Sequence, residues 1–324
     1  EGTRIMGADD NRAMDMQIPA AGEVSLEHLG VIRARGADAT KFLQGQLTND
    51  VAALGLAQAR LAGFCSAKGR LQASFIVWKS AEDEVLLACS ASVLAATLKR
   101  LSMFVLRAQC KLSDATTEVP LHGQVGSVAA QSLGAMRAWE KRDDNGAGVM
   151  RLPDAAGVAR CIVAGTAGAA AASPSAAASS SLWLDHWRWL EVQSGIPTIE
   201  AATVDRFVPQ MLNFEVLGGV DFQKGCYPGQ EVVARSQYRG TIKRRMFLFD
   251  CDTPATAGQE VFHSADPAQP AGMVVNAAPA PQHGWSALVE TKLAALDGGT
   301  LHLGSLEGPA LHPGELPYPL PVAA

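Results

Sequence analysis

The sequence predicts an α+β fold in which a ferredoxin-like domain comes first and a small β-barrel closes the chain. The first hundred or so residues carry signals in the order strand, helix, strands, helix, strand, which is typical of a split βαβ domain. From about Met246 to Leu320, short apolar runs lie between Gly and Pro clusters, which favours a barrel or sandwich. An uncharged Ala/Ser/Gly stretch at 164–181 separates the two parts and is predicted to be a low-complexity loop.

The N-terminal domain is predicted to begin with a strand at Leu29–Ile32. A helix from about Ala37 then directs its apolar residues towards a core, namely Phe42, Leu43 and Leu47. Three strands follow at 61–66, 71–78 and 84–88, and a hairpin at 67–69 joins the first two.

A second helix and a last strand complete this domain. Ser90 is suited to cap the helix, whose apolar positions recur at helical spacing at Leu94, Leu98, Leu101 and Val105. The chain is then predicted to return as a strand from Phe104 to Leu112.

A further helix is predicted at Leu182–Leu190, and the turn at Gly195–Pro197 ends it. It carries three tryptophans, Trp183, Trp187 and Trp189. Because this spacing places at least two rings on a buried face, we predict core packing rather than a platform for stacked bases.

Composition excludes several classes of protein. The 324 residues are 48% hydrophobic and 18% charged, which indicates a globular protein of two or three domains. The net charge of -5 argues against a dedicated nucleic-acid binder. Residues 1–21 lack the apolar segment of a signal peptide and are expected to be flexible, and 161–184 lacks the Leu/Ile/Val/Phe density of a membrane span. A cytoplasmic protein without membrane contact is predicted.

The six cysteines, at 65, 89, 110, 161, 226 and 251, form no CxxC pair, and the sequence contains no HExxH motif. A self-contained zinc or iron–sulfur site is therefore not expected. In a chain of this length, scattered cysteines are more typical of reduced cytoplasmic thiols than of a disulfide framework.

The segment Lys224–Arg245 is strongly basic. It holds six cationic side chains against one carboxylate, a net charge of +5, so the rest of the chain carries -10. The segment is either a solvated basic face or a site for an anionic ligand.

The most informative part of the chain is the turn Lys224–Glu231, which we call the thiol turn. Gly225 and Gly229 permit backbone angles that other residues resist, and Pro228 suits the first position of the helix predicted to follow. A cysteine near a lysine and a helix N-terminus is favoured as a thiolate. Cys226 is therefore predicted to be reactive or ligating; the alternative is a small buried apolar residue.

The thiol turn resembles the signature of the YgfZ-type folate-binding proteins, relatives of the aminomethyltransferase (T-protein) of the glycine cleavage system. Other segments match this family as well, at 42–51, 67–70, 209–213 and 316–318. The resemblance covers roughly residues 24–320. It implies two ferredoxin-like subdomains within 22–245, with the chain crossing between them, and a barrel at 246–322, arranged as a three-part ring around a central channel.

The resemblance also implies a function. The cofactor would be tetrahydrofolate or a derivative, and the role would be that of an accessory protein for assembly or repair of iron–sulfur enzymes, including those that modify tRNA. The expected partners are folate and, transiently, iron–sulfur enzymes or assembly factors, without direct nucleic-acid contact.

Within this interpretation, the catalytic residues are Cys226 and Lys224. The folate-contacting residues are predicted to be Gly225, Tyr227, Gly229, Gln230, Glu231, Arg235 and Arg239. The two arginines would grip the carboxylates of the glutamate tail. Alternatively, the residues that flank Cys226 fix the loop and cap the helix. Cys226 itself could be a nucleophile, one ligand of a shared cluster or a redox-sensitive thiol.

One departure from the T-protein pattern bears on activity. Where those enzymes place an acidic pair after the glycine-rich hairpin, this chain has Ala73 and Ser74, which cannot act as acids. Glu191 is a loose counterpart of their pterin-reading carboxylate, but its spacing differs by two residues and the role is not transferred. Glycine cleavage is disfavoured. An aminomethyltransferase or demethylase acting on a small amine remains the alternative, and a tRNA-binding module is the third hypothesis.

Overall fold

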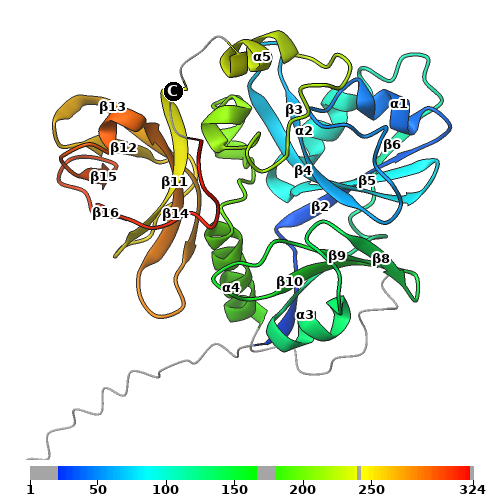
Figure 1. Ribbon diagram of the computed structural model, residues 1–324, viewed down its shortest axis with the longest axis horizontal. Helices are drawn as coiled ribbons and strands as arrows, with labels where there is room; N and C mark the ends of the chain where they lie inside the picture. Colours follow the sequence, from blue (N-terminus) through cyan, green and yellow to red (C-terminus); the bar gives the residue numbers. More distant parts are fainter. Residues whose placement is uncertain (1–20, 166–179, 239–241, 322–324) are drawn as a thin grey trace, which may run out of the picture.

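The computed structural model describes residues 21–165, 180–238 and 242–321. This part of the chain forms three lobes, two with open sheets and one with a closed barrel, grouped around the helix α4 (Ser180–Gln193) (Figure 1). The N-terminus, most of the loop predicted at 164–181, and Arg239 lie outside the described residues. Within the described ranges, no helix is long and apolar enough to cross a membrane.

The first lobe is a five-stranded antiparallel sheet. Its strands, in spatial order, are β3 (Ala59–Cys65), β4 (Leu71–Ala81), β5 (Glu84–Ser90), β2 (Leu29–Arg35) and β6 (Lys111–Asp114). The helices α1 (Ala39–Gln44) and α2 (Ala91–Ser102) pack on one face, where Leu43 and Val93 join Phe64 and Phe75 in a common core. Ser90 accepts a hydrogen bond from the N–H of Ser92 (3.3 Å), so the predicted helix cap is confirmed.

One predicted element is wrong in its extent. The strand expected from Phe104 begins only at Lys111, and Val105 lies beyond the end of α2. Local turns occupy the intervening residues, with hydrogen bonds from the N–H of Phe104 to Leu101 (3.0 Å) and of Cys110 to Ala108 (2.8 Å). Leu106 is 86% exposed, whereas Val105 and Ala108 on either side of it pack against the core of the first lobe.

The second lobe is also a five-stranded sheet, and the chain enters it twice. Its strands are β1 (Gly22–Ser25), β7 (Leu121–Val125), β10 (Arg160–Ala164), β9 (Ala147–Arg151) and β8 (Lys141–Asp144), with α3 (Gly126–Leu133) beside them. After β1 the chain builds the first lobe and returns at β7, which pairs antiparallel with β1 and β10.

The third lobe is a closed barrel. Its strands run in the order β11 (Arg244–Cys251), β14 (Trp285–Lys292), β13 (Asp266–Pro279), β12 (Glu260–His263), β15 (Leu301–Leu303) and β16 (Ala310–Pro313), and a short helix η3 (Leu293–Ala295) follows β14. The predicted architecture of two ferredoxin-like subdomains and a C-terminal barrel is confirmed.

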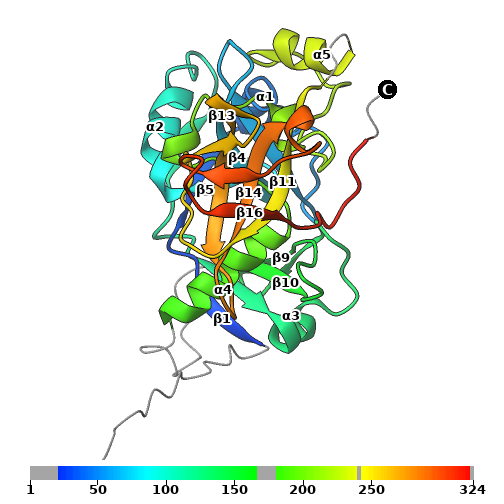
Figure 2. The ribbon, with the colours of Figure 1, turned by 90° about the vertical axis from the view of Figure 1, so that its left-hand side faces the viewer.

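The helix α4 joins the lobes. It packs against β1 of the second lobe and against β13 and β14 of the barrel, and it runs behind the barrel strands in Figure 2. Trp187 is fully buried between the two sheets, in one cluster with Trp78 and Met150. Trp183 and Trp189 pack against the same cluster, as predicted for core residues.

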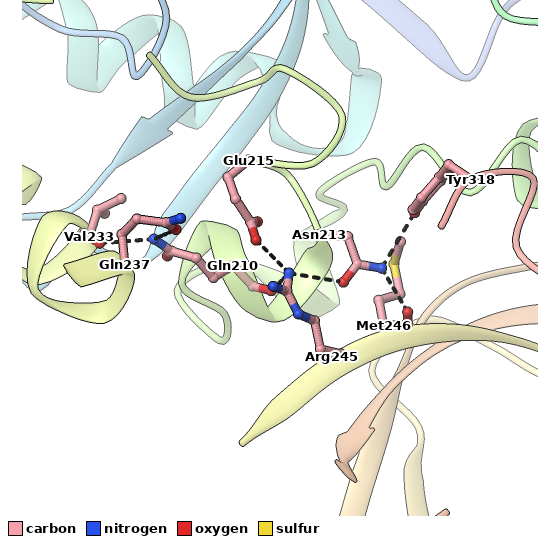
Figure 3. Close-up of polar contacts among 8 residues, drawn as sticks. All are labelled: Gln210, Asn213, Glu215, Val233, Gln237, Arg245, Met246 and Tyr318. Atoms are coloured by element: carbon pink, nitrogen blue, oxygen red, sulfur yellow. Dashed lines mark hydrogen bonds and ion pairs between the residues drawn. The ribbon is translucent and has the colours of Figure 1, made fainter. Parts of the chain in front are cut away.

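Three short helices connect α4 to the barrel: η1 (Ala201–Thr203), η2 (Pro209–Leu212) and α5 (Gln230–Tyr238). The matching segments 209–213 and 316–318 meet here in a polar network (Figure 3). Asn213 donates to the carbonyl of Met246 on β11 (2.7 Å), and Tyr318 donates to the carbonyl of Gly195 after α4 (2.8 Å). These segments therefore fasten the barrel to the rest of the protein.

Candidate functional site

Three adjoining cavities lie where the lobes meet, and we call them the central cavities. The first, of about 180 Å³, is bounded by the first lobe, the helix α4 and the barrel, through Ser90, Glu191 and Asn276. The second, of about 50 Å³, shares Glu191 with the first, and the third, of about 540 Å³, shares Trp139 with the second. A chain of cavities between domains is the usual setting of a small-molecule site.

Glu191 is the carboxylate at the centre of these cavities. Nε2 of His28 lies 2.9 Å from one of its oxygens, and the indole N–H of Trp187 donates to the other (2.9 Å). A quarter of the Glu191 side chain (25%) stays accessible, and it lines the first two cavities. His28 and Trp187 thus orient the Glu191 side chain, and part of it stays accessible from the first two cavities.

The environment of Glu191 keeps it ionised. Burial disfavours its charged form, but the charge and hydrogen bond of His28, with smaller contributions from Arg160 and Trp187, outweigh burial and hold its pKa below the ordinary value. A carboxylate of this kind serves as a hydrogen-bond acceptor rather than as a proton donor.

Ser74 and Cys89 also line the second cavity, but neither offers reactive chemistry there. The Ser74 hydroxyl accepts from the N–H of Ile199 (2.9 Å), and Ala73 beside it is fully buried. Burial, helped by the charge of Asp114, raises the pKa of Cys89 to about 12, so this thiol stays protonated at neutral pH.

The thiol turn lies apart from the central cavities: none of its residues is among those that line them. Cys226 and Gly225 are exposed, whereas Lys224 and Tyr227 on either side are buried. The loop thus presents its thiol outwards. Whether Cys226 acts on a substrate stays a prediction.

The Lys224 side chain holds the turn to the first lobe. Its ammonium donates to the carbonyls of Gln44 (2.5 Å) and Leu47 (2.5 Å) at the end of α1 and lies 5.1 Å from the centre of the Tyr227 ring. Burial lowers the pKa of Lys224 to about 8, against the opposing effects of Asp50, Asp221 and Cys226. These contacts match the alternative in which flanking residues fix the loop.

Gly229 fits the turn against the β3–β4 hairpin. Its φ is +78°, and a Cβ there would lie 2.3 Å from the carbonyl oxygen of Ser66 and 2.6 Å from the backbone of Gly69. Only glycine permits this approach. The same φ explains why α5 begins at Gln230 and not at Pro228, which lies in the preceding turn.

The remaining predicted folate contacts are scattered. Burial raises the pKa of Tyr227, which packs beneath the turn, while Glu231 and Arg235 are exposed on α5 and Gln230 is half-buried at its start. Glu231 lies in the first turn of α5, where a helix N-terminus stabilises negative charge. These assignments stay predictions.

The basic segment does not form one continuous cationic surface in the described residues. Arg244 pairs with Glu290, and Arg245 pairs with Glu215 (2.5 Å), so two of its charges are neutralised within the barrel and its neighbour. Arginines at the mouth of the central cavities come from elsewhere: Arg60 and Arg137 line the third cavity, and Arg188 the first.

The sequence predicts no role for two residues of the cavity wall, His28 and Arg160, and the spacing of Glu191 did not support a role in binding the pterin. No local motif marks His28 or Arg160. For Glu191 a signal existed, because it follows Trp187 by four positions on a helix whose tryptophans were expected to face the core.

Comparison with known proteins gives the family. Residues 13–162 match the family described as the GCVT N-terminal domain. The chain is similar in fold to the glycine cleavage system aminomethyltransferase T of Bartonella henselae, with a TM-score of 0.71 and 18% identity over 92% of this chain and 86% of that one. That level of identity establishes the fold.

Curated relatives are closer in sequence. The tRNA-modifying protein YgfZ of Photorhabdus laumondii is 32% identical over 233 residues, 69% of each chain, and that of Colwellia psychrerythraea is 30% identical over 240 residues, 72% of this chain and 73% of the relative. The tRNA-modifying protein YgfZ of Edwardsiella ictaluri is 35% identical over 230 residues, 67% of each chain. With this identity over two thirds of both sequences, the chain belongs to the YgfZ family.

Proposed function

We propose that this protein binds tetrahydrofolate or a derivative in the central cavities and supports the assembly or repair of iron–sulfur enzymes, including enzymes that modify tRNA, through Cys226. The observation that carries the folate part is Glu191, a half-buried, ionised carboxylate that is oriented by His28 and Trp187 and lines two of the cavities. The GCVT domain match and relatives named for tRNA modification support the same assignment.

The chemistry of folate fits these walls. The ring N–H and amino groups of a pterin are donors, and an ionised carboxylate can accept from both. The glutamate tail carries carboxylates, and the third cavity is lined by Arg60, by Trp139 and by Arg137, whose Nε also pairs with Glu140 (2.8 Å). These arginines are better placed for the tail than Arg235, which lies on α5 and lines none of the central cavities.

The second candidate, an aminomethyltransferase or demethylase, has weaker support. Such chemistry needs a group that exchanges a proton with the folate or the amine. Of the two positions after the hairpin, Ala73 is buried in the core of the first lobe, and Ser74 lines the second cavity but accepts a hydrogen bond from the backbone of Ile199. Glu191 stays ionised and is already bound to its two neighbours.

The placement of Cys226 suggests what it reacts with. Because the thiol is exposed and does not line the central cavities, a macromolecular partner reaches it more readily than a folate held between the lobes does. The three chemistries, nucleophile, cluster ligand and redox thiol, all fit such a partner.

The test combines binding with cellular activity. Calorimetric titration with tetrahydrofolate should give a dissociation constant in the micromolar range or below. In a strain that lacks the protein, iron–sulfur enzyme activity should fall, and the wild-type chain should restore it. Cys226→Ala should bind folate normally but fail to restore activity.

Cys110→Ala is the matched control, because Cys110 is a half-buried thiol on a surface turn, and this variant should restore activity fully. Absence of folate binding, with iron–sulfur enzyme activity unchanged in the deletion strain, would contradict the proposal. If Cys226→Ala restored iron–sulfur enzyme activity fully, the proposed role of the thiol would be refuted.

A further inference from the structure

Arg160, at the start of β10, is a buried cation with an unused hydrogen-bond donor. The residue is 1% exposed and lines the second central cavity. Its Nε donates to the carbonyl of Pro153 (3.0 Å), whereas Nη1 has no hydrogen-bond partner within the described part of the chain. The guanidinium group lies 5.8 Å from the centre of the Trp187 ring.

Such an arrangement is unfavourable unless something else accepts the hydrogen bond. A charged donor that is buried without an acceptor loses the hydration that it has in the unfolded chain. Burial lowers the pKa of Arg160 to about 10, so the group is still charged at neutral pH. The missing acceptor is therefore expected from a molecule in the cavity.

The position of Glu191 indicates what that molecule is. Glu191 and Arg160 line the same cavity but do not form an ion pair with each other among the described residues. An acceptor and a donor thus border one space, with Trp187 in contact with both: its ring lies by the guanidinium, and its N–H bonds the carboxylate.

We infer that Arg160 donates to the 4-oxo group of a 2-amino-4-oxo ring that is bound to Glu191, and that Arg160 thereby selects oxo rings over 4-amino rings. In such a ring, the oxo group is bonded to the carbon next to the ring N–H that a carboxylate accepts. When Glu191 takes the ring N–H and the amino group, the oxo oxygen therefore projects beside the carboxylate, towards a neighbouring donor. This inference rests on the proposed binding of folate.

The experiment compares two ligands and three proteins by calorimetry. The ligands are tetrahydrofolate and its 4-amino counterpart, in which the acceptor is replaced by a donor. Wild-type protein should bind the 4-amino ligand about 10–100-fold more weakly, the range expected for one charge-assisted hydrogen bond. Arg160→Gln should bind tetrahydrofolate about 10–100-fold more weakly than wild type and should distinguish the two ligands poorly.

Arg151→Gln is the matched control. Arg151 lies opposite Cys161 on the adjacent strand β9, and it also bonds a backbone carbonyl, that of Met136 (2.7 Å), but it does not line the central cavities. Its affinity for both ligands should equal that of wild type. Thermal unfolding of each variant shows whether it is folded.

The outcomes separate this inference from the function on which it rests. If wild-type protein binds neither ligand, the proposed folate function fails and this inference fails with it. If wild type binds both ligands equally well, or if folded Arg160→Gln binds tetrahydrofolate like wild type, folate binding stands and the role of Arg160 is refuted. Should Arg160→Gln not fold, the ligand comparison in wild-type protein decides.

Discussion

The central cavities and the thiol turn are built in opposite ways. The cavities are lined by side chains from separate elements of the fold, among them Glu191, which is held by His28 and Trp187. In the thiol turn, by contrast, polar and small residues fix the backbone. Lys224 donates to carbonyls at and just after the end of α1, Gly229 packs on the hairpin, and Cys226 is exposed. The most specific sequence motif thus marks a turn that exposes a thiol, whereas the central cavities are formed by residues that share no motif.

A polar network connects the two regions. Gln210 donates to the carbonyl of Val233 on α5 (2.8 Å), next to the thiol turn, and its own carbonyl accepts from Arg245 (3.2 Å). From Arg245 the contacts lead through Asn213 to Tyr318 (Figure 3). Tyr318 in turn donates to the carbonyl of Gly195, which precedes the cavity residue Ile196. The network gives the two regions a common support.

The largest expected difference is in thiol reactivity. Alkylation of native protein at pH 8, followed by peptide mass spectrometry, should modify Cys226 first. Cys89 should react more slowly by a factor on the order of 1000, because its pKa of about 12 leaves roughly one molecule in 10⁴ ionised and its side chain is buried.

The half-buried Cys110, whose pKa is also raised by burial, should react at an intermediate rate and serves as the internal reference. Comparable alkylation rates at Cys89 and Cys226 would contradict the burial of Cys89 and the exposure of Cys226.

Loss of the ion pair in the connecting network should cost the most stability. Arg245→Ala leaves the Glu215 carboxylate buried without its cation, and burial already raises the pKa of Glu215. The free energy of unfolding should fall by about 3–5 kcal/mol in urea titrations. Arg142→Ala, which removes an exposed pair with Asp144, should cost about 1 kcal/mol or less. Equal effects of the two substitutions would show that the network is not a support.

The two glycines of the thiol turn should differ. Gly229→Ala forces a Cβ to within 2.3 Å of the Ser66 carbonyl at a φ of +78°, and should lower the free energy of unfolding by about 2–4 kcal/mol. Gly225→Ala meets nothing within 4 Å, so its effect should stay within about 0.5 kcal/mol. If Gly225→Ala were the more harmful to stability, the described packing of the turn would be wrong.

The buried ammonium group of Lys224 should make a smaller contribution to the free energy of unfolding, and one that depends on pH. Its pKa is about 8 in the folded protein against 10.5 ordinarily, so between these values the unfolded chain binds more protons and a rise in pH favours folding. The free energy of unfolding of wild type, minus that of Lys224→Met, should therefore increase from pH 8 to pH 10.5 and be flat below pH 8. A decrease over this range would contradict the buried position of the ammonium group.

Much of the fold could be predicted because its first lobe follows local rules. Alternating and helical apolar spacings gave β2 to β5 and α2, and the Ser90 cap fixed where α2 begins. The start of β6 was predicted wrongly. A short apolar run favours a strand in the sequence, whether or not the run pairs with a neighbouring strand in the fold. The second sheet was not derivable from spacing, because β1 pairs with β7 about a hundred residues later.

The candidate site, like the fold, could be predicted only where its residues are close in the sequence. Cys226 and its turn could be singled out from residue types that lie within eight positions of one another. The cavity wall could not, because His28, Arg160 and Glu191 come from distant parts of the chain, and each is unremarkable by itself. Only the packing of the lobes around α4 brings these three residues together.

The most direct test of the separation between the proposed folate site and the thiol compares Glu191→Gln with Cys226→Ala in calorimetric titrations with tetrahydrofolate. Glu191→Gln should weaken binding about 10–100-fold, because a charged acceptor becomes neutral, whereas Cys226→Ala should bind like wild type. If Cys226→Ala abolished binding while Glu191→Gln retained it, folate would lie at the thiol turn and the central claim would be wrong.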